Sequence, residues 1–390
     1  MKNNRTFLEK LLDGAEVEWK TLDEISSIYG GLTGKGKADF ENGNALYVPY
    51  KNIFNNIEVD FNNLDTVNVS DDEKQYTIKY GDVLFTGSSE TAEEAGMSSA
   101  VTTKTEQKIY LNSFSFGLRF NDDIELLPEF SKFLFRTLSI RKEIVKSASG
   151  VTRFNISKAR FKKIKIPIPP LPVQIEIVKI LDALTALTSE LTSELILRQK
   201  QYEYYREKLL SFDSLEQLNS GRGKKKLIDV AKIKNGKDWK HLEEGNIPIY
   251  GSGGIMGYVD TYSYDKPTVL IPRKGTITNI FYLEEPFWNV DTIYYTEIDT
   301  TQILPKYFYH FMKTVDLTKL DTGSGRPSLT QAILNEIPIF VPSIEEQQRI
   351  ISILDKFETL TNSITEGLPL AIEQSQKRYE YYRELLLNFS

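Results

Sequence analysis

The chain has 390 residues, of which 40% are hydrophobic, so it is long enough to bury the cores of two or three globular domains. Its 48 Lys and Arg residues against 54 Asp and Glu residues give a formal charge of −6, which excludes a general polyanion binder coated in positive charge. It has no cysteine and two histidines, which excludes disulfide scaffolds, cysteine-based zinc sites and thiol nucleophiles.

The N-terminal stretch, residues 1–16, does not resemble a signal peptide. It mixes Lys2, Arg5, Glu9 and Lys10 with its apolar residues and so lacks a continuous apolar core. No later run approaches the roughly 18 apolar residues that a membrane-spanning helix needs. We therefore expect a cytoplasmic protein with no membrane partner.

Short runs of β-forming residues dominate residues 14–168, which we call head 1. The runs 82–85 and 115–120 are examples, and clusters of Gly, Asn, Asp and Ser separate such runs. Between Arg153 and Lys165 there are six basic residues and no acidic one. This run favours contact with phosphate groups, the alternative being an ordinary solvated face.

A long amphipathic helix is predicted after head 1. Pro172 suits a first helical position, and apolar residues then recur every three or four positions from Ile177 to Leu195. Residues 173–212 would span about 60 Å at 1.5 Å per residue, and such a helix does not stand alone in water. Its apolar stripe therefore requires a partner helix.

Residues 226–341, called head 2, have the same β-rich character, with strands expected at 268–271 and 292–295. A basic run at 222–240 precedes and enters this head, with eight basic residues and two acidic ones. The heads resemble each other weakly, as expected of one scaffold that carries two different surfaces.

The second long helix is predicted to start at a capping box formed by Ser343 and Glu346. Gly367 and Pro369 interrupt its apolar stripe. Because proline lacks a backbone donor and clashes with the preceding turn, we expect a kink or break near Leu368.

An internal repeat organises these elements. The hexapeptide Tyr-Glu-Tyr-Tyr-Arg-Glu occurs at 202–207 and again at 379–384, and Ile-Leu-Asp occurs at 180–182 and 353–355. Further matched residues stand in the same order in both copies: Gly150, Arg153 and Gln174 in the first, Gly323, Arg326 and Gln347 in the second. The chain is thus two copies of one module, each a head followed by a helix.

Common catalytic motifs are absent from the sequence. Residues 30–36 miss the phosphate-loop spacing, residues 251–254 do not form Gly-x-Ser-x-Gly, and no Asn/Asp-Pro-Pro-Tyr/Phe tetrapeptide of amino-methyltransferases occurs. His310, in an apolar stretch, is predicted to pack in a core rather than act as a base, and His241 to lie at the surface. We predict no catalytic residue and no metal site, an enzyme with an unrecognised active site being the alternative.

These features together resemble the DNA-specificity (S) subunit of type I restriction-modification systems over essentially the whole chain. The resemblance rests on two variable heads, Pro-rich entries at 167–172 and 338–342, the Gln and Ile-Leu-Asp helix starts, and the repeated hexapeptide. Segments 81–90, 247–254 and 323–330 are also similar to the family. The tandem Leu-Thr-Ser-Glu tetrads at 187–194 resemble the tetrapeptide repeats with which such subunits set the distance between half-sites.

The resemblance implies an α+β fold. Two β-rich target recognition domains would be joined by two long conserved helices that form an antiparallel coiled coil, with an internal pseudo-twofold repeat. We place the first recognition domain at 1–170, the first spacer helix at 171–213, the second recognition domain at 214–342 and the second spacer helix at 343–390.

The resemblance also implies a non-catalytic subunit of a bacterial or archaeal complex. Each head would read one half of a split, asymmetric sequence in double-stranded DNA, and the helices would dock two methyltransferase subunits, to which restriction or motor subunits are added. No cofactor is expected on this chain; S-adenosylmethionine, ATP and Mg²⁺ are expected on the partner subunits. Two alternatives are a specificity subunit of a type IIB-like or stand-alone methylation complex, and a two-headed adaptor that binds a sugar or peptide.

Candidate DNA contacts follow from residue type, because Arg pairs with guanine and Asn or Gln with adenine in the major groove. The candidates in head 1 are Ser88, Arg153, Asn155, Lys158 and Arg160. Those in head 2 are Tyr250, Ser252, Arg273, Lys274, Ser324, Arg326, Ser328 and Gln331. Arg153 and Arg326 align between the copies, which favours a shared contact with the DNA backbone over base reading.

Overall fold

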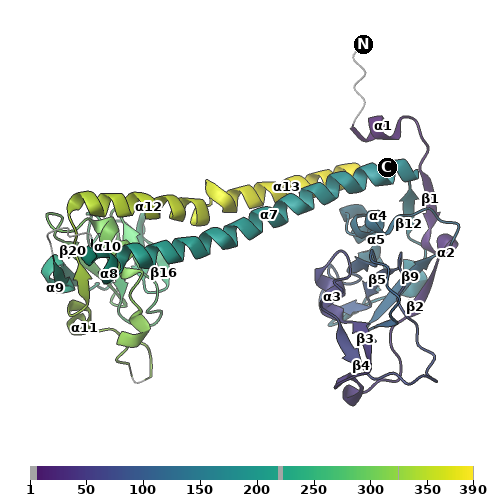
Figure 1. Ribbon diagram of the computed structural model, residues 1–390, viewed down its shortest axis with the longest axis horizontal. Helices are drawn as coiled ribbons and strands as arrows, with labels where there is room; N and C mark the ends of the chain where they lie inside the picture. The colour runs from purple at the N-terminus through teal and green to yellow at the C-terminus, as the bar shows by residue number, and fades with distance from the viewer. Residues whose placement is uncertain (1–6, 218–222, 324, 390) are drawn as a thin grey trace, which may run out of the picture. The chain divides into compact units, whose positions relative to one another are not determined.

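The computed structural model describes residues 7–217, 223–323 and 325–389. The chain forms two compact units, Met1–Ser189 with Glu373–Ser390, and Glu190–Ile372. Head 1 belongs to the first unit and head 2 to the second, and each unit also contains parts of the long helices (Figure 1). Within the described ranges, no helix has the length and apolar character required to cross a membrane.

A four-stranded antiparallel sheet forms the centre of head 1, in the order β2 (Ser26–Gly30), β9 (Ser115–Phe120), β5 (Val83–Thr86), β7 (Ser98–Ala100). The strands expected at 82–85 and 115–120 are thus confirmed as β5 and β9. A second sheet has the order β4 (Asp65–Val67), β3 (Ala45–Val48), β8 (Ile109–Leu111). Two smaller ladders are β1 (Glu18–Thr21) with β12 (Lys165–Ile168), and β10 (Ala148–Ser149), β11 (Phe154–Ile156), β6 (Ser88–Ser89).

Short helices surround these sheets: α1 (Phe7–Leu12), α2 (Leu22–Ile25), η1 (Lys37–Phe40), α3 (Tyr50–Asn55), α4 (Pro128–Leu134), α5 (Leu138–Lys146) and α6 (Lys158–Phe161). Pro128 starts α4, where its missing N–H has no helical acceptor to lose, and the Thr137 hydroxyl caps α5. The buried ring of Phe85 contacts those of Phe116 and Phe161 at centroid distances of 5.4 and 4.9 Å. Burial of each such ring contributes about 2–3 kcal/mol to folding.

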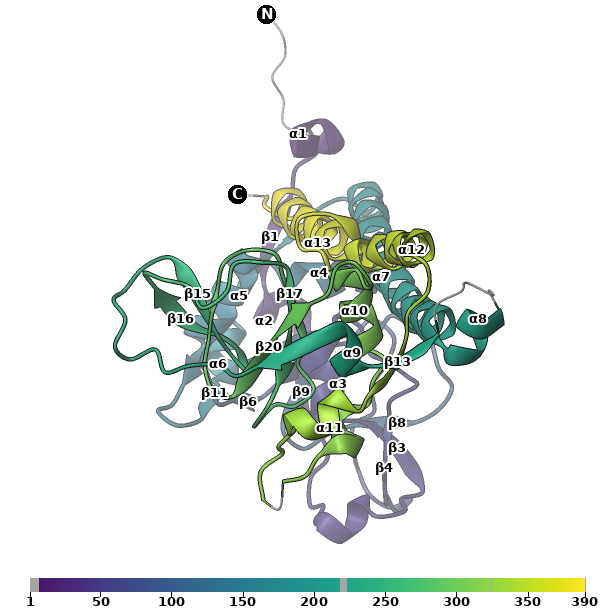
Figure 2. The ribbon, with the colours of Figure 1, turned by 90° about the vertical axis from the view of Figure 1, so that its left-hand side faces the viewer.

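Head 2, which faces the viewer in Figure 2, repeats three of these sheets in its described residues, while the ladder of β10, β11 and β6 is reduced there to one β-bridge between Lys274 and Ser328. Its central sheet has the order β14 (Ala231–Lys234), β20 (Ile293–Ile298), β17 (Thr268–Pro272), β18 (Phe281–Leu283), and its second sheet β16 (Gly254–Val259), β15 (Ile247–Gly251), β19 (Trp288–Asn289). The ladder β13 (Lys224–Lys226) with β21 (Pro338–Phe340) matches β1 with β12. The helices are α8 (Phe212–Gln217), α9 (Leu227–Val230), α10 (Pro305–Met312), η2 (Leu317–Leu320) and α11 (Gln331–Asn335). The internal repeat therefore extends to both heads.

The first long helix, α7 (Leu171–Leu210), has 40 residues. The second stretch is divided into α12 (Ile344–Asn362) and α13 (Gly367–Leu386), which confirms the expected break. Gly367 has φ +84°, and a Cβ there would lie 2.5 Å from the carbonyl oxygen of Thr359, so only glycine fits this close approach to α12. Pro369 then lies in the first turn of α13, where a missing N–H costs no hydrogen bond.

Each unit contains an antiparallel pair of helical segments. In unit 1, the Thr188 hydroxyl of α7 lies 2.9 Å from the Ser375 hydroxyl of α13, while Leu181 shares a core with Leu386 near the other end of the pair. In unit 2, the rings of Tyr202 and Tyr205 pack on Phe357 of α12. The apolar stripe of α7 thus finds its expected partner in the second helical stretch.

Candidate nucleic-acid interface

A hairpin brings three of the five candidate residues of head 1 together. Its turn starts at Gly150, whose φ is +152° and where a Cβ would lie 2.0 Å from the carbonyl oxygen of Arg153. Strand β11 then pairs with β6, so that Asn155 lies opposite Ser88. The Nε of Arg153 donates a hydrogen bond of 3.0 Å to the Ser88 hydroxyl. The other two, Lys158 and Arg160, are exposed on α6 just beyond the hairpin.

A cleft of about 440 Å³ adjoins this hairpin and is lined by Ser88 and Arg153 together with residues that the sequence did not single out. Tyr50 and Lys51, at the start of α3, also line it, and the Tyr50 hydroxyl donates to the Ser88 carbonyl oxygen at 2.8 Å. When the two heads are aligned on the matching strands β3 and β15, Tyr50 falls at the position of Ser252. Since Ser252 was a candidate in head 2, this alignment could have identified Tyr50 from the sequence.

A half-buried arginine fixes the helix that carries Tyr50 and Lys51. The guanidinium of Arg136 donates to the carbonyl oxygens of Ile53 at 3.1 Å and Asn56 at 3.1 Å, at the C-terminal end of α3. Burial lowers the pKa of Arg136 to about 10, so it remains charged at neutral pH. Cations favour the C-terminal end of a helix, where carbonyl groups lack helical partners. The wall of the cleft is thus anchored from inside head 1.

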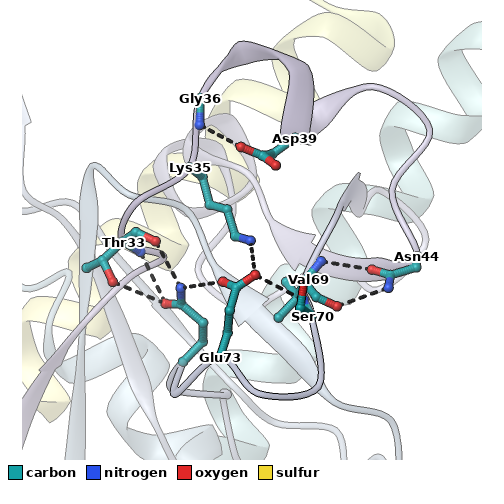
Figure 3. Close-up of polar contacts among 9 residues, drawn as sticks. Thr33, Lys35, Gly36, Asp39, Asn44, Val69, Ser70 and Glu73 are labelled. Atoms are coloured by element: carbon teal, nitrogen blue, oxygen red, sulfur yellow. Dashed lines mark hydrogen bonds and ion pairs between the residues drawn. The ribbon is translucent and has the colours of Figure 1, made fainter.

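A second network, shown in Figure 3, joins two loops at the edge of head 1. The Glu73 carboxylate accepts hydrogen bonds from Lys35 at 2.5 Å and from the backbone N–H of Ser70 at 3.0 Å. The Gln75 amide donates to Glu73 at 3.0 Å and to the Thr33 carbonyl oxygen at 2.9 Å. Hydrogen bonding by Lys35 is the largest cause that lowers the pKa of Glu73 to about 2. The Lys35 side chain is only 6% exposed, so its ammonium group pairs with Glu73 within the head and does not face solvent.

Head 2 builds the same hairpin from different side chains. A Cβ at Gly323 would lie 1.9 Å from the Arg326 carbonyl oxygen, which matches Gly150 and Arg153 in head 1. Lys274 forms a β-bridge with Ser328, as Ser88 pairs with Asn155. Ser324 lies outside the described residues. The structure therefore brings together the predicted residues of this hairpin and of the loop after β17.

Cationic side chains extend from this region of head 2. Arg326 is exposed, and the Lys274 side chain is 50% exposed, with its ammonium 3.9 Å from the Asp291 carboxylate. Arg273 donates to the Asp291 carbonyl oxygen at 3.3 Å, and its guanidinium lies 5.8 Å from the centroid of the Tyr294 ring. These weak contacts leave the cations accessible to an anionic ligand.

The remaining candidates of head 2 have contacts within the fold. The N–H of Ser252 donates to the Thr292 hydroxyl at 3.2 Å, and the ring of Tyr250 packs against Phe281 at 5.6 Å and Phe287 at 6.4 Å. Burial raises the pKa of Tyr250. Gln331 starts α11 after the capping residue Thr330, just as Lys158 starts α6 after Ser157.

The matched glutamines of the repeat join each head to its helix. The buried Gln174 amide accepts from the Leu127 N–H at 2.9 Å and donates to the carbonyl oxygens of Glu125 and Pro169, both at 2.8 Å. Gln347 makes the same three bonds, to Leu304, Gln302 and Pro342, at 2.7, 3.0 and 2.9 Å. The sequence showed the match, and the structure supplies its physical cause.

The Asp of each Ile-Leu-Asp motif makes a second head-to-helix contact. Asp182 pairs with the ammonium of Lys132 at 2.8 Å, and Asp355 pairs with that of Lys306 at 2.7 Å. His310 is completely buried, as predicted, with Nε2 2.9 Å from an Asp355 oxygen, and burial lowers its pKa. Glu358 is also close, but the Tyr309 hydroxyl donates to it at 3.1 Å. Neighbouring donors thus occupy both carboxylates, which favours a structural role for this cluster.

Comparison with known proteins gives a consistent result. The family described as type I restriction modification DNA specificity domain matches residues 15–198 and 219–374. A type I restriction enzyme specificity subunit of Haemophilus influenzae is 41% identical over 100% of both chains. The EcoR124I/EcoR124II specificity subunit of Escherichia coli is 32% identical, with 98% of this chain and 97% of that one covered.

Solved structures share the fold at lower identity. The S subunit of a type I restriction-modification system from M. genitalium has a TM-score of 0.54 at 20% identity and covers 97% of this chain and 98% of its own. The HsdS subunit from Thermoanaerobacter tengcongensis has a TM-score of 0.56 at 15% identity and covers 96% of each chain.

Proposed function

The chain belongs to the family of type I restriction modification DNA specificity domains, and on this premise we propose that its two heads read the two halves of a bipartite, asymmetric duplex target. One observation carries the proposal. Both heads build the same hairpin beside the loop after the central strand, yet they present different side chains on it. A shared scaffold with unlike reading residues suits two unlike half-sites.

The aligned positions divide the candidate contacts into two classes. Arg153 and Arg326 are the same residue on the same turn, so we assign them to phosphate contact, which positions a protein without reading sequence. The paired positions Asn155 and Ser328 differ, as do Ser88 and Lys274. We assign these to base reading, with Asn155 suited to adenine and Lys274 to guanine.

The repeated hexapeptide supports docking of two copies of one partner. The Arg206 guanidinium lies over the Tyr202 ring and that of Arg383 over the Tyr379 ring, at 5.2 and 5.6 Å from the centroids, so the same Arg–Tyr contact recurs in both copies. Tyr204 and Tyr381 are matched and are 56% and 63% exposed.

Packing within the chain does not explain two identical exposed tyrosines, whereas two methyltransferase subunits that bind the same surface would. This chain would then supply specificity, while those partners and added restriction or motor subunits would carry out the chemistry. Within that assembly the chain itself has no catalytic role.

Reciprocal substitution tests the assignment of the heads. The chain would be co-expressed with its methyltransferase, and the methylated motif determined by single-molecule sequencing for the wild type, Asn155→Ser and Ser328→Asn. We expect each variant to relax or change one half-site and leave the other intact. A change in both half-sites from one substitution, or in neither from both, would contradict the assignment.

A further inference from the structure

An exposed phenylalanine lies beside the candidate interface of head 1, next to Arg153. Phe114 is 64% exposed, although its backbone is tightly held. Its N–H donates to the Asn112 side-chain oxygen at 3.0 Å, and its carbonyl oxygen accepts from the Gly87 N–H at 2.8 Å. A Cβ at position 87 would lie 2.7 Å from that carbonyl oxygen, so glycine allows this contact. The fold thus presents a large apolar ring to solvent from a fixed backbone.

Phe114 lines a cleft of about 450 Å³ whose other aromatic members are Phe40, Tyr47 and Tyr50. Phe40 and Tyr47 pack edge to face with centroids 5.2 Å apart, and Tyr50 is fixed by its hydrogen bond to Ser88. The wall formed by residues 35–40 is held by the bond from Lys35 to Glu73. The cleft is therefore preformed, and its volume exceeds that of a nucleobase.

The charges around this cleft match a nucleic acid. The guanidinium of Arg153 lies 5.8 Å from the centroid of the Phe114 ring, and the exposed Lys37 lines the same cleft. Lys51 lines the neighbouring cleft, whose carboxylates Glu90 and Glu94 balance its charge, so the cations that serve this site are Arg153 and Lys37. A flat aromatic surface flanked by cations suits a base and the phosphates on either side of it.

The repeat offers a comparison, because Thr292 occupies the position of Phe114 in head 2. The Thr292 carbonyl oxygen accepts from the N–H groups of Arg273 and Lys274, as that of Phe114 accepts from Gly87. The Thr292 hydroxyl, however, accepts a hydrogen bond from the Ser252 N–H. The scaffold thus holds its shape without an aromatic residue here, so packing alone does not account for Phe114.

We propose that Phe114 stacks on a nucleobase of the half-site read by head 1, a base that leaves its normal stack when the duplex binds. The cleft behind the ring receives part of that base. This inference rests on the proposed function and adds to it a contact that reads shape and stacking rather than a hydrogen-bond pattern.

The test measures duplex affinity with the complex of this chain and its methyltransferase. The variants are Phe114→Ala, Phe114→Trp and, as the matched control in head 2, Thr292→Ala. Each variant is measured on an unmodified duplex that carries the motif determined by methylation sequencing. It is also measured on a series of the same duplex in which one position of the motif at a time is abasic. Since stacking on one base changes affinity by about 5- to 150-fold, we expect Phe114→Ala to weaken binding by about 10-fold or more and Phe114→Trp to retain it.

The abasic series identifies the base. At one position of the first half-site, the abasic duplex is expected to bind the wild type and Phe114→Ala equally, because the contact is already lost. In Thr292→Ala, the ratio of intact to abasic affinity should equal that of the wild type at every position of that half-site, whatever effect the lost bond to Ser252 has on head 2. Equal affinity of the wild type and Phe114→Ala on the intact motif would overturn the inference and leave the proposed function standing. A wild-type complex that does not prefer its motif over a scrambled duplex would overturn both.

Discussion

Loss of the buried glutamine contact is expected to loosen one unit and leave the other intact. The Gln174 side chain hydrogen-bonds to one backbone N–H and two carbonyl groups, and the Gln347 side chain makes the equivalent three bonds. Methionine has nearly the same length but replaces the amide with an apolar group. A buried group left without its partner costs about 1–3 kcal/mol, so three such groups cost about 3 kcal/mol at the lower end of that range.

Hydrogen exchange with peptide resolution measures this effect in each unit separately. A cost of about 3 kcal/mol raises the local opening constant by roughly 100-fold. Gln174→Met should therefore speed exchange in α4 by about that factor and leave α10 unchanged, and Gln347→Met should do the reverse. The exposed Gln199 of α7 provides the control, and Gln199→Met should alter neither helix. An unchanged exchange rate of α4 in Gln174→Met would refute this reasoning.

Two further predictions concern pH and helix length. Burial lowers the pKa of His310 in the folded state below its ordinary 6.5, so protonation favours unfolding, and unit 2 should lose thermal stability as pH falls through about 6.5. His310→Phe places at this position the residue type that head 1 has at the matching Phe133, and it should make the melting temperature of unit 2 less dependent on pH. An unchanged slope of melting temperature against pH in this variant would contradict the prediction. Deleting residues 187–190 removes one tetrad and about 6 Å of helix, equal to one or two base steps of about 3.4 Å. Methylome sequencing should then show a shorter spacer with both half-sites unchanged, whereas altered half-site bases would count against this role.

Local signals in the sequence predicted the helices and the repeat well. The apolar periodicity of α7 and the interruption at Gly367 and Pro369 depend on residues near one another in the chain, so they could be interpreted directly. The strands β5 and β9 followed from short β-forming runs for the same reason. The match of Gly150 with Gly323 was visible in the sequence, and the structure explains it by the close approach of a carbonyl oxygen in each hairpin turn.

The composition of the candidate interface was only partly predictable, because its members come from distant segments. Tyr50 meets Ser88 through a bond between residues 38 positions apart, and no local pattern indicates that contact. Phe114 directly precedes the predicted strand 115–120, and no sequence pattern indicated that its ring would be exposed. No local pattern indicated that Lys35 and Glu73 would join two loops either. Alignment of the two heads would have indicated Tyr50, since Ser252 at the matched position was already a candidate.

The methylation motif of the wild-type chain tests the central claim most directly. The chain would be expressed with its methyltransferase in a host without other methylation, and modified positions determined by single-molecule sequencing. Two heads with one scaffold and different reading residues predict a single motif with two unlike half-sites and a spacer of fixed length. A continuous motif, or a palindrome with identical halves, would contradict the account.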